Sequence, residues 1–368
     1  MKKRYIVRTV LIVLGALILI VGSAALEQYY RLQVSNFRSR NGQEHSYNIY
    51  PGATIDSVLA LLDSDYFIGS RTDFYLHKRL LLFNNPEPGH YTFPPQFGDR
   101  EVIDRLKYGR QTPVNITWNH YVRTREDLAG KVARNLMLDS VDVLQRLDSN
   151  EYMAQFGMNK ETSRCLFIPN TYQVLWNITP DKLFARMNYE YNTFWNKERR
   201  HKADSIGLTP IEVAIIASIV ESESHNPNEL PIIASLYLNR VRKGMLLQAC
   251  PTVIYAVGDF KMRRVLKRHL AIDNPYNTYK YPGLPPGPIR CPAPETMDIV
   301  LNAPQTNYLF MCANPQLNNT HIFSSSYGQH AAAAADYRHT MDTINWEKFD
   351  ERRRREREQA KLEAQQKQ

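Results

Sequence analysis

Glu221 is the residue of this 368-residue chain whose type and setting point most directly to chemistry. It directly follows the uncharged stretch Val213–Val220 and begins the polar segment Glu221-Ser222-Glu223-Ser224-His225. An ionisable group at the end of a buried helix is costly without a partner or a purpose, and partial burial favours its neutral acid form. A carboxylic acid that stays protonated near neutral pH is what glycosidic cleavage needs as its general acid. A carboxylate that merely caps or pairs at the helix end is the alternative, and these residues alone leave both open.

Other polar side chains near Glu221 form no recognisable catalytic motif. Glu223 is two residues further on, about 200° around a helix, so it is expected to face elsewhere. His225 could be the base of a hydrolase, but the sequence has no Gly-x-Ser-x-Gly elbow and no glycine-rich phosphate loop. The four cysteines lack the paired spacing of a zinc site, so neither a metal nor a cofactor is expected.

The elements that must position Glu221 can be predicted from capping signals and apolar patterns. Thr209 and Glu212 match a capping box, and the apolar run after them predicts a buried helix. Residues 276–294 are rich in Pro, Gly, Tyr and Asn, which indicates an ordered functional loop. Residues 306–323 alternate enough to hold two strands. We therefore expect a larger mixed α+β domain over residues 115–346.

A smaller α+β domain is predicted over residues 45–114. Its expected elements are strands at 47–50 and 89–93 and helices at 54–62, 71–81 and 100–108. Residues 27–44 are polar and are expected to form a linker. The fold class is therefore α+β, with two folded domains.

The N-terminus predicts the compartment. A basic cluster within residues 1–8 precedes the uncharged run 9–26, which is about as long as the 20 residues that span a bilayer. The positive flank predicts a cytoplasmic N-terminus and export of everything after Glu27. A cleaved signal peptide is the alternative, because Gly22-Ser23-Ala24-Ala25 offers small residues. The formal net charge of +9 suggests acidic partners such as anionic lipid or nucleic acid, and export excludes the latter.

At this point the sequence resembles the endolytic murein transglycosylases, or YceG-like proteins. The resemblance covers the anchor and the whole exported part, and its blocks occur in the family's order. These blocks are LFIPNTY, ASIVESES, SLYLNRVRKGMLLQACPTVIYAVGD and PYNTYKYPGLPPGPI. It implies a small LysM-like domain before the catalytic one, and a single-pass anchor in the cell inner membrane with the catalytic domain in the periplasm.

The resemblance places the family's catalytic glutamate at Glu221. The implied reaction is lytic cleavage of the β-1,4 bond between N-acetylmuramic acid and N-acetylglucosamine, which leaves 1,6-anhydro ends and terminates strands. Penicillin-binding proteins are the implied partners. A non-catalytic peptidoglycan-binding scaffold is the alternative, and a true glycan hydrolase with a distant Asp is a third. Residues expected to shape the groove, with loop scaffolding as their other interpretation, are Asn239, Arg240, Gln248, Thr252, Tyr276, Asn277, Thr278 and Tyr279.

The chain departs from the family pattern at several positions. Cys250 and Asn170 stand where many relatives have Asp, and Trp118-Asn119-His120 replaces a common turn, so residues 120 and 250 cannot be given the usual polar roles. Because Cys250 and Cys291 each precede a proline beside the expected groove, a disulfide between them is one hypothesis and two isolated thiols the other. The charged tail 347–368 is expected to be solvated and partly helical, with a membrane-surface contact as the alternative.

Overall fold

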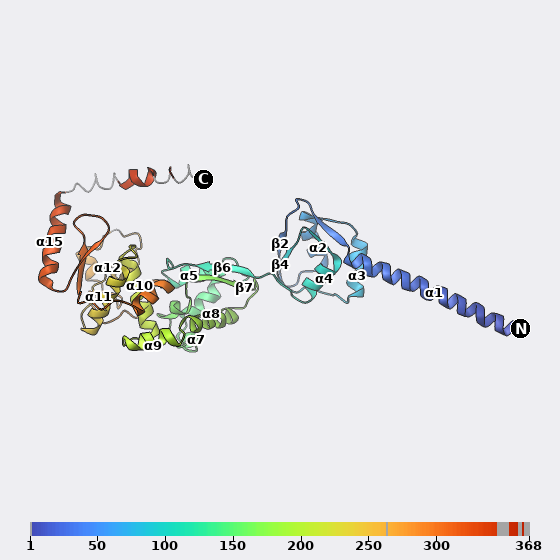
Figure 1. The fold of residues 1–368 in the computed structure, drawn as a ribbon, viewed down its shortest axis with the longest axis horizontal. Helices are drawn as coiled ribbons and strands as arrows, with labels where there is room; N and C mark the ends of the chain where they lie inside the picture. The colour runs from blue at the N-terminus through green and yellow to red at the C-terminus, as the bar shows by residue number, and fades with distance from the viewer. Residues whose placement is uncertain (1, 263, 344–352, 360–362, 364–368) are drawn as a thin grey trace. The chain divides into compact units, whose positions relative to one another are not determined.

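The computed structural model describes residues 2–262, 264–343, 353–359 and 363. The fold is mixed α+β, as the sequence predicts (Figure 1). The chain separates into two compact units, which are described one at a time. Unit 1 comprises residues 1–116, 133–138 and 171–179, and unit 2 comprises residues 117–132, 139–170 and 180–368. Most of the charged tail predicted at 347–368 lies outside the described residues.

Unit 1 contains one long helix followed by a compact α+β module. Its elements are α1 (Lys2–Gln33), β1 (Ser35–Ser39), β2 (His45–Ile49), α2 (Ile55–Asp65), β3 (Tyr66–Ile68), α3 (Arg71–Leu80), β4 (Gly89–Phe93), β5 (Gln96–Gly98) and α4 (Asp99–Lys107). The strands form one antiparallel sheet in the order β3-β1-β5 and a second pair, β2-β4. The two strands and three helices predicted from the sequence are all present. The segment predicted as a linker instead contains the end of α1 and the central strand β1.

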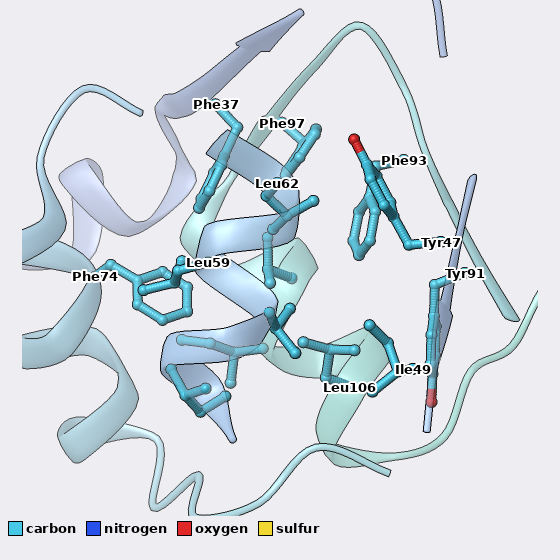
Figure 2. Close-up of a cluster of buried hydrophobic side chains, with 14 of the residues drawn as sticks. Phe37, Tyr47, Ile49, Leu59, Leu62, Phe74, Tyr91, Phe93, Phe97 and Leu106 are labelled. Atoms are coloured by element: carbon cyan, nitrogen blue, oxygen red, sulfur yellow. The ribbon is translucent and has the colours of Figure 1, made fainter. Parts of the chain in front are cut away.

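The core of unit 1 explains why these residues form these elements. Thr54 caps α2 through a reciprocal capping box with Ser57, and α2 buries Val58, Leu59 and Leu62. Around them lie the aromatic side chains of the strands (Figure 2). Phe37 of β1 is fully buried and stacks on Phe97 at 4.8 Å. Burial of this one aromatic side chain thus stabilises an otherwise polar segment as a strand of the sheet.

A buried hydrogen bond between two ionisable side chains joins α3 to α4 in unit 1. His77 Nδ1 lies 2.6 Å from Asp99 Oδ2, and both side chains are 1% exposed. The other carboxylate oxygen of Asp99 accepts a hydrogen bond from Asn36 Nδ2 at 2.6 Å. Replacing Asp99 would therefore remove one hydrogen-bond partner from the buried His77 and one from the half-buried Asn36.

Asp99→Ala is expected to lower the free energy of unfolding of unit 1 by about 3 kcal/mol, because breaking a buried pair strands its partners. Thermal and urea unfolding of the full chain in detergent would measure this. Asp63→Ala is the matched control, since its pair with Arg71 is about half exposed (side chains 45% and 50%) and should contribute little. Equal shifts in the two variants would contradict the expectation.

Helix α1 is the one unbent helix of the described residues that is long and apolar enough to cross a membrane. Its apolar part spans Thr9–Gln33 and is not buried within the protein. The bent pair of α9 (Lys197–Ser205) and α10 (Pro210–Glu223) passes the same test, but α10 is buried in the core of unit 2. A single N-terminal membrane helix is therefore consistent with the anchor predicted from the sequence.

Unit 2 is mainly helical. Its other elements are α5 (Arg125–Ala133), α6 (Ser140–Asp148), α7 (Asn150–Ala154), the 3-10 helix η1 (Ser163–Leu166), α8 (Pro180–Phe194), α11 (Leu230–Arg242), α12 (Cys250–Val257), α13 (Lys267–Leu270), α14 (Pro294–Leu301), β8 (Phe310–Ala313), β9 (His321–Ser324) and α15 (Tyr327–Thr343). Strands β8 and β9 pair antiparallel, which confirms the two strands predicted at 306–323. A further sheet pairs β6 (Val114–Trp118) with β7 (Asn170–Val174), and most residues of these two strands belong to unit 1.

Helix α10 lies at the centre of unit 2. Thr209 caps it, with Glu212 completing the predicted capping box and Pro210 in the first turn. Every residue from Val213 to Glu221 is buried, and the helix packs against α11, α12 and α14. Because the buried part of α10 is mostly apolar and packed on several sides, its last turn has a fixed position.

Candidate active site

Glu221 occupies the last turn of α10, and a serine one turn earlier connects that helix to the loop at residues 276–294. Ser218 is fully buried and donates its hydroxyl to the carbonyl of Ile215 at 2.7 Å. The same hydroxyl accepts a hydrogen bond from the backbone N–H of Ile289 at 3.0 Å. The loop is thereby held against α10, so that Arg290, the residue after Ile289, lies beside Glu221.

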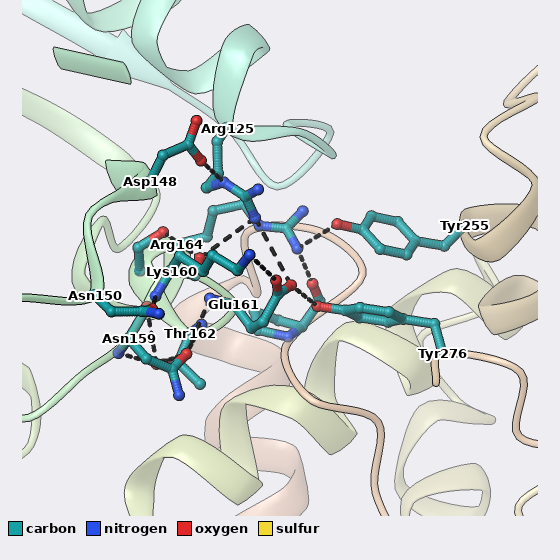
Figure 3. Close-up of polar contacts among 12 residues, drawn as sticks. Arg125, Asp148, Asn150, Asn159, Lys160, Glu161, Thr162, Arg164, Tyr255 and Tyr276 are labelled. Carbon is teal, nitrogen blue, oxygen red and sulfur yellow. Dashed lines mark hydrogen bonds and ion pairs between the residues drawn. The ribbon is translucent and has the colours of Figure 1, made fainter. Parts of the chain in front are cut away.

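Contacts on its other side fix the same loop in place. Gly287 packs so closely on the backbone of Glu161 that an added Cβ would lie 2.0 Å from the carbonyl oxygen. Tyr276 donates its hydroxyl to Glu161 Oε2 at 2.8 Å, and Arg125 approaches the same carboxylate at 3.8 Å (Figure 3). The fully buried Arg164 donates to the carbonyl of Pro288 and to the hydroxyl of Tyr255. The loop is therefore a rigid support for the residues that follow it.

The Glu221 carboxyl group is nearly enclosed, with 11% of its side chain exposed. Its Oε2 accepts from the backbone N–H of Ala293, the N-cap of α14, at 3.4 Å. Its Oε1 lies 3.4 Å from the hydroxyl of Thr296, in the first turn of α14, and 3.7 Å from His120 Nδ1. Donors at a helix N-terminus favour a negative charge. The site can therefore accept the carboxylate form of Glu221 as well as the acid.

Arg290 is the cation beside this carboxyl group. It is 2% exposed, and its Nε lies 3.9 Å from Glu221 Oε2. Nε donates to the carbonyl of His120 at 2.6 Å, and Nη1 donates to the carbonyl of Glu221 at 3.4 Å. The remaining nitrogen, Nη2, is buried and has no hydrogen-bond partner in the part of the chain that the structure describes. The guanidinium of Arg290 thus keeps one nitrogen unpaired among the described residues.

The balance of burial and charge sets the protonation of the site. Burial raises the pKa of Glu221 to about 7, against the opposing effects of Arg290, the Ala293 N–H and the Thr296 hydroxyl. Burial also lowers the pKa of Arg290, and burial together with Arg290 lowers the pKa of His120. Near neutral pH, Glu221 can therefore both give up a proton and take one back.

Glu221→Gln is expected to raise the thermal stability of the protein at pH values above about 7. The folded pKa of about 7 exceeds the ordinary value of 4.5, so stability present below pH 4.5 is lost as pH rises towards 7. The full loss is about 3 kcal/mol, and a glutamine, which mimics the neutral acid, avoids it. Melting curves of both proteins at pH 4 and pH 8 would measure the difference, and a gap that does not grow with pH would contradict it.

The residues predicted to shape a groove are engaged within unit 2. Asn239 donates to the carbonyls of Thr306 and Tyr308, and the buried Arg240 donates to the carbonyl of Leu309. Arg240 also reaches Gln248 Oε1 at 3.3 Å. These bonds connect α11 to the segment before β8.

The other predicted groove residues form a second internal network. Thr252 and Thr278 are buried and share a hydrogen bond at 2.8 Å, and the backbone N–H of Gln248 donates to the carbonyl of Thr278. Asn277 donates to the carbonyls of Leu270 and Ile272. Tyr276 faces Glu161, and Tyr279 is half-buried. These contacts favour the scaffolding interpretation, and a sugar-binding role stays a prediction.

The cysteines are all free thiols in the structure, so the hypothesis of a Cys250–Cys291 disulfide is not supported. Cys250 is exposed and its Sγ lies 3.1 Å from the hydroxyl of Tyr279. Cys291 is fully buried, and burial raises the pKa of its thiol to about 12. The two sulfurs have different surroundings, which matches the alternative of isolated thiols.

A polar pocket of about 880 Å³ is lined by Glu223, which follows Glu221 by two residues in the sequence, but not by Glu221 itself. Its lining includes Glu223, His225, Asn226, Asn318, Asn319 and His321, together with Arg353 and Arg357 of the tail. Glu229 holds the two sides together, because it accepts from Ser224 and from both the ring and the backbone N–H of His321. Amide and imidazole groups of this kind suit hydroxyl and acetamide groups of a ligand.

The sequence did not single out Arg290 or Thr296, and it left His120 without a role. No local pattern marks them, because each reaches Glu221 through the folding of a distant segment. The available sequence signal for Arg290 was that it directly follows the block PYNTYKYPGLPPGPI, which ends at Ile289. No group of three or more His, Cys, Asp or Glu side chains suited to a metal ion occurs among the described residues.

Comparisons with known proteins agree with this architecture. The model of the YceG-like family matches residues 47–336. An endolytic murein transglycosylase of Bacillus subtilis (strain 168) is 26% identical over 312 residues, which cover 79% of this chain and 84% of that protein. One of Streptococcus pneumoniae (serotype 2, strain D39) is 29% identical over 154 residues, 40% of this chain and 27% of the relative.

A crystal structure of a yceG-like protein from Listeria monocytogenes shares the fold. It superposes with a TM-score of 0.52 at 23% identity, covering 79% of this chain and 99% of that one. At this identity the likeness concerns the fold alone.

Proposed function

This chain belongs to the YceG-like family, and we propose that it is a membrane-anchored lytic transglycosylase that cuts peptidoglycan strands with Glu221 as its catalytic acid and base. The names of its relatives support a transglycosylase role. The observation that carries the proposal for this chain is the buried Glu221 carboxyl group with a pKa of about 7 beside Arg290.

The proposed reaction breaks the β-1,4 bond between N-acetylmuramic acid and N-acetylglucosamine. The Glu221 acid gives its proton to the glycosidic oxygen, and the N-acetylglucosamine side leaves as an alcohol. The resulting carboxylate takes the proton of the muramoyl C6 hydroxyl, whose oxygen bonds to C1 and closes a 1,6-anhydro ring. The proton count balances without water, and Glu221 returns to its acid form.

One carboxyl group suffices for this sequence of steps, whereas most glycosidases use two. The nearest acidic residue in the same turn, Glu223, accepts a hydrogen bond from Tyr237 at 2.5 Å. Burial raises the pKa of Glu223 to about 7 as well, so the bond from Tyr237, rather than the pKa, distinguishes this carboxyl group from that of Glu221. A pKa near 7 supports both roles of Glu221, because donation and return of a proton are then closely balanced.

Arg290 is proposed to stabilise the carboxylate that exists between the two steps. Its guanidinium lies 3.9 Å from Glu221 Oε2 in a nearly closed site, where a preorganised charge acts more strongly than in water. Its free Nη2 is proposed to donate to an oxygen of the bound sugar. The polar pocket lined by Glu223, His225 and His321 is the proposed binding site of the glycan.

The remaining parts of the proposal concern location and partners. Residues 9–26 would anchor the chain in the inner membrane, with residues 45–114 as a LysM-like domain and 115–346 as the catalytic domain in the periplasm. Cutting nascent strands would terminate their elongation and would bring the protein near penicillin-binding proteins.

Digestion of purified glycan strands followed by mass spectrometry tests the function. Fragments that end in 1,6-anhydro-N-acetylmuramic acid are expected. Reducing ends would instead identify a hydrolase, and intact strands would identify a binding scaffold, so either result would overturn the proposal.

A further inference from the structure

An apolar groove runs between α1 and α3 in unit 1, and it is separate from the proposed active site. The groove has a volume of about 580 Å³ and is lined by Ile20, Ala24, Tyr29, Leu76, Leu80 and Leu81, among others. Leu80 is 61% exposed and Leu82, just beyond α3, is 78% exposed. Exposed leucines beside an apolar groove indicate a surface that contacts a partner or a membrane.

The end of α1 is fixed to the rest of unit 1, so the groove has a defined shape. Leu32 is buried. Its carbonyl oxygen lies so close to Gly98 that a Cβ atom added to that glycine would be only 3.0 Å away. Arg31 Nη1 lies 3.3 Å from Asp73 Oδ2, which connects α1 to the first turn of α3. Leu76 and Leu80 follow Asp73 along α3 and face the groove.

The position of the groove within the bilayer follows from the length of a membrane-spanning helix. At 1.5 Å per residue, a hydrocarbon layer of about 30 Å that begins at Thr9 ends near Tyr29. Tyr29 and Tyr30 are 59% and 71% exposed, and tyrosines are enriched at this interface. Ile20 and Ala24 then lie inside the leaflet nearer the α+β module of unit 1. Since they share one groove with Leu76 and Leu80, those leucines reach the same leaflet.

We infer that α3 is an interfacial helix whose leucines Leu76 and Leu80, together with Leu82 just beyond it, insert into the lipid leaflet beside the anchor. The occupant of the groove is the acyl chain of a phospholipid. The basic residues Lys78 and Arg79 in the last turn of the same helix suit anionic phosphate headgroups. This lipid contact rests on the proposed anchoring and adds to it a second contact with the membrane.

The test places a fluorescent probe on the full chain in vesicles of phosphatidylethanolamine and phosphatidylglycerol, with or without spin-labelled lipid. The probe is attached to Leu80→Cys in a Cys250→Ser, Cys312→Ser background, which leaves only the two buried thiols. Leu80 is largely exposed, so its replacement removes little packing. Leu19→Cys in the anchor is the positive control, and Leu61→Cys, 44% exposed on α2, is the matched negative control.

The Leu80 probe is expected to show blue-shifted emission and lipid quenching close to that of the Leu19 probe. Quenching of the Leu80 probe no stronger than that of the Leu61 probe would overturn the insertion of α3 into lipid while leaving the anchor intact. A Leu80 probe shielded from both lipid and aqueous iodide would show a protein in the groove and would also overturn it. Absence of quenching at Leu19 would overturn the anchor and the insertion of α3 together.

Discussion

Glu221→Gln is expected to reduce the rate of glycan cleavage by about 10³-fold or more, since general acid–base catalysis of one step alone contributes roughly 10²- to 10⁴-fold. Glutamine keeps the shape of the protonated side chain, but it can neither donate to the glycosidic oxygen nor accept from the C6 hydroxyl. Both proposed steps therefore fail together. Initial rates of anhydro-end formation on purified strands would measure the loss.

A matched control separates the loss of this proton from the loss of a nearby charge. Glu295 is an exposed carboxylate whose charge acts on Glu221, and Glu295→Gln should keep activity close to that of the parent. Binding of intact strands by Glu221→Gln should persist, because the pocket residues are unchanged. Cleavage within a few-fold of the parent rate would refute the assignment of Glu221.

Local sequence signals predicted much of what positions Glu221. The capping box at Thr209 and Glu212 fixed the start of α10, and its apolar run predicted the burial that raises the pKa of Glu221. Such signals report on neighbours within a few residues. Arg290 and His120 are joined by a hydrogen bond across 170 residues of sequence, which no periodicity records.

Residue type was a weaker guide than position in the fold. Asn277 and Thr278 have side chains suited to sugars, but such side chains also satisfy buried backbone groups, and here they do so. Polar composition likewise disguised β1, where the one buried aromatic residue Phe37 outweighs its polar neighbours. The same polar side chain can bind a sugar or satisfy a buried backbone group, and only tertiary contacts show which of the two it does.

Arg290→Met is expected to slow cleavage by about 10²- to 10³-fold, because removing one preorganised donor from an active site costs on this order. Methionine fills a similar volume without a charge, so the carboxylate formed after the first step loses its stabilisation. The same change raises the pKa of Glu221 further, because Arg290 opposes the effect of burial. The decline of the rate at alkaline pH should therefore move to higher pH.

The pH profile distinguishes this role from a structural one. Arg290→Lys keeps a charge and should restore the position of the alkaline decline, although it cannot reproduce the bonds to the carbonyls of His120 and Glu221. Arg199→Met is the control, because it removes an arginine that pairs with Asp298 on α14 without contacting Glu221. A variant that merely destabilised unit 2 would lower the amount of folded enzyme and leave the profile in place. An unmoved alkaline decline in Arg290→Met would thus show that the arginine supports the fold rather than the chemistry.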